Sequence, residues 1–104
     1  MKLSEAQKKI IEKAHNDIDY ARTHMLVEWA AKNLGYLGRK LGEYEIDRIK
    51  SYANDYKKYY EREKNGIVLC RANSRTIKKL EEMGLVEILN DGGNFPDTLK
   101  ILNY

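Results

Sequence analysis

Residues 73–89, NSRTIKKLEEMGLVEIL, and the tail NDGGNFPDTLKILNY (90–104) decide the fold expected of this chain. Ser74 is a typical helix cap and Gly84 a typical helix stop, and Ile77, Leu80 and Met83 face inward between them. Residues 85–89 then predict a strand, the Asp-Gly-Gly run at 91–93 a tight turn, and residues 98–102 the returning strand. The expected order is helix, strand, turn, strand.

The part upstream of this stretch is predicted to be helical. Ser4 and Gln7 form a capping-box pattern, and apolar residues then recur every three or four positions as far as Gly35. This segment is either one long helix or two helices with a bend near Thr23-His24. We favour the bend, because typical helices are far shorter than ~30 residues. The glycine-rich run GYLGRKLG (35–42) predicts a loop.

A second long helix is predicted from Glu43 to Lys64, with acidic residues in its first turns, basic residues in its last, and Asn65-Gly66 as the stop. Its apolar stripe contains four of the eight tyrosines. Such a stripe either packs on a core or forms an interface, where tyrosine is enriched. The candidate partner-interface residues are Tyr52, Tyr56, Tyr59 and Tyr60.

The fold class expected from these patterns is α+β, in a single domain of residues 1–104. Residues 1–66 form the helical part, with two or three helices, and residues 67–104 form a strand, a helix and a β-hairpin. The first strand is the apolar run at 67–70, in which Cys70 is expected to be a buried small hydrophobe.

The composition excludes several classes of function. The chain is 42% hydrophobic and 34% charged, and no apolar run is long enough to cross a bilayer. The start shows no signal-peptide pattern, so we expect a cytoplasmic protein that does not interact with membranes. The pairs His15/Asp19 and His24/Glu28 have the i,i+4 spacing of a metal or proton-shuttle site, but no third ligand matches. We therefore predict no enzyme, metal, cofactor or small-molecule substrate.

The basic charge lies before the final hairpin, not on it. The helix at 75–83 directs Arg75, Lys78 and Lys79 outward, with Ser74 and Thr76 at its start, and Arg71 and Asn73 lie just upstream. Cations neutralise phosphates, and an arginine in the first helical turn can reach a guanine in the major groove. These seven residues are the predicted nucleic-acid contacts.

The run SRTIKKLEEMGLVEIL also resembles the recognition helix and first wing strand of winged helix-turn-helix proteins. The residues in matching places are Ser74, Thr76, Leu80, Gly84, Leu85, Val86 and Glu87. The resemblance covers about a third of the chain. It implies DNA contacts from Arg75, Thr76, Lys78 and Lys79, with residues 90–97 as the wing.

Two functions follow as predictions. The first is a small DNA-binding or DNA-associated regulatory protein that presents residues 75–83 to double-stranded DNA. The alternative is an interaction or structural module, in which the tyrosine-rich helix binds a second copy of the chain or another protein.

Overall fold

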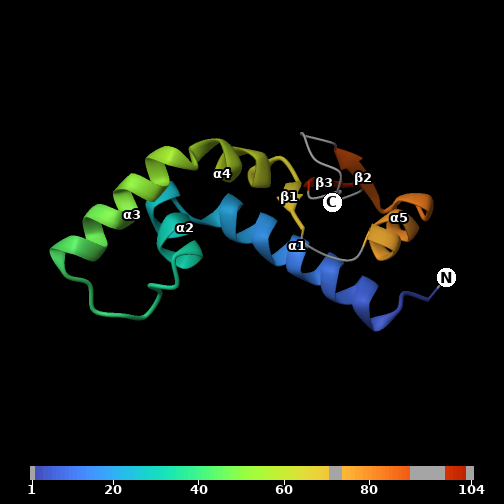
Figure 1. Cartoon of the computed structure of the whole chain (residues 1–104), viewed down its shortest axis with the longest axis horizontal. Coiled ribbons are helices and arrows are strands. Elements are labelled where there is room, and N and C mark those ends of the chain that lie inside the picture. Colours follow the sequence, from blue (N-terminus) through green and yellow to red (C-terminus); the bar gives the residue numbers. More distant parts are fainter. Residues whose placement is uncertain (1, 71–73, 90–97, 103–104) are drawn as a thin grey trace.

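The computed structural model describes residues 2–70, 74–89 and 98–102, which form helices followed by a small antiparallel sheet (Figure 1). The helical part contains α1 (Glu5–Thr23), α2 (Leu26–Asn33), α3 (Glu43–Asp55) and α4 (Lys57–Lys64). The second part contains β1 (Ile67–Leu69), α5 (Ser74–Glu82), β2 (Val86–Leu89) and β3 (Thr98–Ile101). The predicted α+β class and the order strand, helix, hairpin are confirmed.

The capping box predicted at the start of α1 is present. The Ser4 hydroxyl accepts from the Gln7 backbone N–H at 3.2 Å, and the Gln7 side chain accepts from the Ser4 N–H at 2.8 Å. The predicted bend is also confirmed: α1 ends at Thr23, His24 has extended backbone angles, and α2 begins at Leu26.

The prediction of one helix over residues 43–64 is wrong. Tyr56 leaves helical geometry, with φ −112° and ψ 18°, and separates α3 from α4. The reason is tertiary packing, because α3 packs mainly against α2 whereas α4 packs mainly on α1 and β1. With this break and the bend after α1, four helices precede β1 in the described residues, not two or three.

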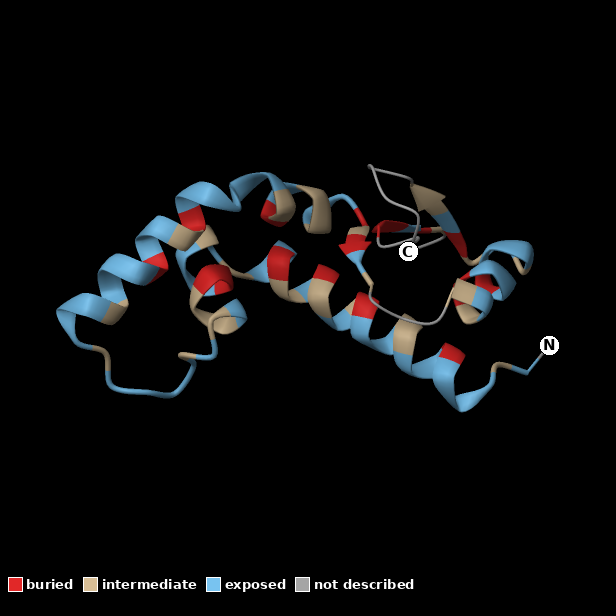
Figure 2. Ribbon diagram, viewed as in Figure 1, coloured by how far each residue is buried: buried red, intermediate tan, exposed pale blue. Residues whose placement is uncertain are grey.

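The buried hydrophobic side chains form two clusters that share α1. Figure 2 marks the buried residues along the ribbon. Ala14 and Ile18 of α1 pack with the sheet and α5, whereas Ala21, one turn further on, packs with α2, α3 and α4. The molecule is elongated, 48 × 28 × 21 Å, because the clusters lie one after the other along α1. The sheet and α5 are therefore at one end and α3 at the other (Figure 1).

Strand β3 is the centre of the sheet and pairs antiparallel with both β1 and β2. Leu99 of β3 is opposite Val68 of β1 and Ile88 of β2, and it is fully buried. Cys70, just beyond β1, packs against this cluster but is only half-buried, so the expectation of a buried small hydrophobe is met only in part. The turn predicted at 91–93 lies outside the described residues.

Candidate nucleic-acid interface and aromatic cleft

Helix α5 has one buried face and one exposed basic face. Ile77 and Leu80 are fully buried against the sheet and α1. Arg75, Lys78 and Lys79 are exposed on the outer side of the same helix. The 3.6-residue period separates the two faces in this way, as the sequence predicted. The three cations therefore lie on one solvent-facing surface at the sheet end of the molecule.

The junction after α5 holds the helix against the hairpin. Gly84 has φ 77°, a left-handed conformation that suits glycine. Its N–H donates to the Glu81 carbonyl at 3.0 Å and the Leu85 N–H to the Leu80 carbonyl at 3.1 Å, which is a Schellman cap. The Glu81 carboxylate also accepts from the backbone N–H of Ile88 in β2 at 3.2 Å. These bonds set the direction in which α5 presents its outer face.

The other predicted nucleic-acid contacts are either less exposed than the three cations or lie outside the described residues. Ser74 and Thr76 are half-buried at the start of α5. Arg71, Asn73 and the predicted wing at 90–97 fall outside the described residues. The described element before α5 is strand β1, in the place where a helix-turn-helix has a short helix.

The four candidate interface tyrosines do not share one environment. Tyr60 is buried, its ring contacts Trp29 edge-on at 5.6 Å between centroids, and its hydroxyl donates to the His24 carbonyl at 2.7 Å. It therefore belongs to the core. Tyr52 and Tyr59 are half-buried, and Tyr56 is 42% exposed.

Tyr52, Tyr56 and Tyr59 line a cleft of about 490 Å³ on the side of α3 and α4 that faces α1 and β1. That volume is in the range of small-molecule sites, roughly 300–1,000 Å³. The remaining walls come from α1, α2, α4, β1 and β3, through Lys13, Asp17, Trp29, Asn33, Arg62, Glu63, Ile67, Val68, Leu69 and Thr98. The cleft combines aromatic rings and apolar strand residues with both signs of charge.

Glu63 is the most perturbed acid in the cleft. Its carboxylate accepts a hydrogen bond from the Trp29 indole N–H, which connects α4 to α2. Burial raises the pKa of Glu63 from 4.5 to about 7; the Trp29 bond opposes the rise, Asp17 adds to it, and Lys32 and Lys13 oppose it. The pKa of Tyr52 is also raised, by burial and then by Tyr56 and Glu63.

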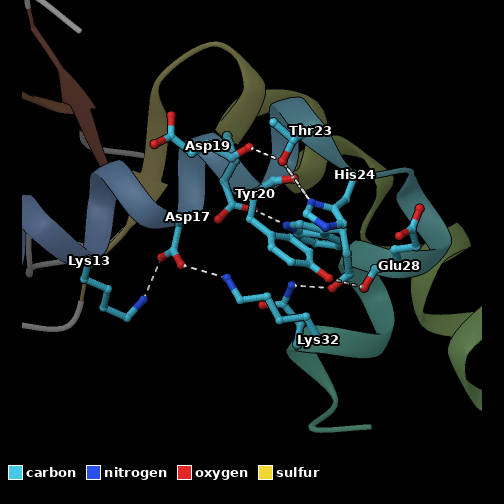
Figure 3. A network of polar contacts seen from close by, with 11 residues as sticks. Lys13, Asp17, Asp19, Tyr20, Thr23, His24, Glu28 and Lys32 are labelled. Atoms are coloured by element: carbon cyan, nitrogen blue, oxygen red, sulfur yellow. Dashed lines mark hydrogen bonds and ion pairs between the residues drawn. The ribbon is translucent and has the colours of Figure 1, made fainter. Parts of the chain in front are cut away.

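A polar network on α1 borders this cleft (Figure 3). Asp17 accepts from Lys13 at 2.7 Å and from Lys32 at 3.4 Å. Further along, the His24 ring stacks on Tyr20 with 3.7 Å between centroids. The network therefore joins α1 to α2 next to the aromatic residues of the cleft.

Of the two predicted metal or proton-shuttle pairs, His24 and Glu28 take part in this helix junction, whereas His15 and Asp19 lie within α1. His24 Nδ1 lies 2.9 Å from the Thr23 hydroxyl and 3.1 Å from the Tyr20 carbonyl, and Glu28 accepts from the Met25 N–H at 3.3 Å. Across residues 2–70, 74–89 and 98–102, no three His, Cys, Asp or Glu side chains gather in a way that could hold a metal ion. None of the helices in these ranges is both long and apolar enough to cross a membrane.

The sequence patterns indicated the tyrosines of the cleft but not Glu63, Trp29 or Asp17. Trp29 is the only tryptophan of the chain, which was the one available signal. In the sequence, Glu63 is one more charged residue near a helix end. Its burial depends on how α4 lies against α2, which periodicity does not predict.

Comparison with known proteins adds no relative: no family model matches the chain, and neither the curated proteins nor the solved structures contain a significant match.

Proposed function

We propose that the protein binds double-stranded DNA through the outer face of α5, in a DNA-associated regulatory role. The observation that carries this proposal is the joint exposure of Arg75, Lys78 and Lys79 opposite the buried Ile77 and Leu80. Side chains on one face of a helix can approach neighbouring phosphates together, and phosphate contacts supply most of the affinity for a duplex. The resemblance to a recognition helix followed by a wing strand supports the same face.

The hydrogen-bonded junction around Gly84 supports the proposal for a second reason. A helix that enters a groove gains affinity when its orientation is set before binding, because less freedom is lost on association. The Schellman cap and the Glu81–Ile88 bond hold α5 against the hairpin in this way.

The test is the salt dependence of binding to a labelled mixed-sequence duplex, measured by fluorescence anisotropy. Each phosphate contact contributes about 0.9 to the slope of log affinity against log salt. The double variant Arg75→Ala/Lys79→Ala should therefore reduce the slope by about 1.8. Over a fourfold rise in salt, the affinity of the wild type should then fall about twelvefold more than that of the variant.

The matched control is Lys40→Ala/Lys50→Ala, which removes the same charge from exposed positions on the loop before α3 and on α3 itself, at the other end of the molecule. Its slope should equal that of the wild type. Equal losses of affinity in the two double variants would mean that only net charge matters, and the proposal for α5 would then be wrong. Absence of binding by the wild type at low salt would exclude general duplex binding altogether.

A further inference from the structure

The cleft between α4, β1 and α1 has a continuous aromatic wall. The ring centroids of Tyr52 and Tyr56 are 4.4 Å apart, those of Tyr56 and Tyr59 5.7 Å, and those of Tyr52 and Trp29 5.9 Å. All four rings line the same cleft. The faces of such rings carry a negative partial charge that attracts cations.

A half-buried carboxylate lies beside this wall. Glu63 accepts a hydrogen bond from the Trp29 indole N–H. Lys13 and Lys32 both act on the charge of Glu63, but each forms an ion pair with Asp17. The ion-pair distances are 2.7 Å for Lys13 and 3.4 Å for Lys32. An ionised carboxylate has about four acceptor positions, so the bond from Trp29 leaves Glu63 with negative charge that can attract a cation, whether or not the cation carries an N–H.

We propose that this cleft binds a small organic ammonium ion, with its nitrogen near Glu63 and its carbon substituents on the rings of Tyr52, Tyr56 and Tyr59. A cation in this position would interact with the ring faces and with the carboxylate in a partly water-excluded site, where both attractions are stronger than in water. The side chains of Ile67, Val68 and Leu69 supply an apolar wall for the rest of the ligand.

The charges of the cleft alone do not exclude a second class of ligand, the organic acids. Lys13 and Arg62 also line the cleft, so an organic acid would find cations there. Lys13 is already paired with Asp17, however, and the aromatic wall repels anions. A cation therefore fits the arrangement better, and the two classes are separated by the experiment.

The only tryptophan lies in the cleft, so its emission reports binding directly. The probe is choline at pH 8, and its control is 3,3-dimethylbutan-1-ol, which has the same shape without the charge. Choline should shift the Trp29 emission in a saturable way, and the alcohol should bind at least about tenfold more weakly. A parallel titration with Nε-trimethyllysine tests where the bound ammonium group comes from. It compares a free small molecule with a trimethylated lysine side chain.

Two variants test the residues. Glu63→Gln keeps an acceptor for the Trp29 N–H and should weaken choline binding about tenfold. Tyr56→Leu should weaken it about fivefold, whereas Tyr44→Leu should not change it. Tyr44 is an exposed tyrosine at the start of α3 that does not line the cleft. Far-UV circular dichroism of each variant verifies that the helices are intact.

The affinity for choline should also rise between pH 5 and pH 8, because Glu63 loses its proton over this range and becomes negatively charged. The other charged residues in or beside the cleft are Asp17, Lys13, Lys32 and Arg62. The proposal would be overturned by equal responses to choline and the alcohol, by preferential binding of acetate or benzoate, or by identical affinities of the Tyr56 and Tyr44 variants. Emission that changes only with protein concentration would indicate self-association over Tyr56 and would equally overturn it.

Discussion

Replacing Glu63 by glutamine should make the protein's stability less sensitive to pH. The pKa of Glu63 is raised in the fold from 4.5 to about 7, chiefly by burial. A carboxyl with a raised pKa binds its proton more tightly in the folded state. Its contribution to the free energy of unfolding is therefore fully present below pH 4.5 and is lost as the pH rises through about 7. Glutamine stays neutral across this range and can still accept from the Trp29 N–H.

The size of the effect follows from the shift. A rise from 4.5 to about 7 is about 2.5 units, which corresponds to at most about 3.4 kcal/mol. Solvent screening of a half-buried side chain reduces this to about 1–2 kcal/mol. The Glu63→Gln variant should therefore gain about 1–2 kcal/mol of stability relative to the wild type between pH 4.5 and pH 8.

Urea unfolding followed by far-UV circular dichroism at pH 4.5, 6 and 8 measures this difference. The emission of Trp29 in native protein should show a transition near pH 7 in the wild type and none in the variant, since the indole donates to the titrating group. Glu61→Gln is the matched control, because Glu61 is an exposed acid of the same helix. If the stability difference between the wild type and the Glu63→Gln variant stays constant within about 0.5 kcal/mol over this range, the reasoning is refuted.

Two further substitutions test the core and the helix junction. Tyr60→Phe should lower the free energy of unfolding by about 1 kcal/mol or more, because the half-buried His24 carbonyl loses its donor, whereas Tyr44→Phe at an exposed site should change it by less than about 0.5 kcal/mol. Gly84→Ala should cost about 1–2 kcal/mol and Gly84→Asn less, since a Cβ at this position meets no atom within 4 Å and the cost comes from φ 77° alone. Chemical denaturation measures both series, and equal stabilities of the Gly84 variants would contradict the role of the left-handed conformation.

The DNA proposal and the ammonium proposal concern different parts of the molecule. Helix α5 lies at the sheet end of the molecule (Figure 1). The tyrosine-lined cleft is formed instead where residues of α4 and β1 meet residues of α1. Failure of one test therefore leaves the other unaffected.

Local signals in the sequence determined where most elements begin and end. The capping box at Ser4, the bend at Thr23-His24 and the stop at Gly84 depend on residues within one helical turn of each other, and all three are present in the structure. The buried and exposed faces of α5 could likewise be predicted from the sequence. The helical period alone places Ile77 and Leu80 opposite the basic residues of this helix.

Tertiary packing decided the features that involve several elements. The break at Tyr56 could not be predicted, because residues 43–64 have an uninterrupted helical pattern and the break depends on the different main partners of α3 and α4. The division of the tyrosines between the core and the cleft follows from that bend. The raised pKa of Glu63 has the same origin, since it arises from burial beside Trp29, a residue 34 positions away in the chain. The helical period of the sequence shows which side of a helix is apolar. How deeply a residue on that side is buried, and whether an acid there is charged, depend on the elements that the fold packs against it.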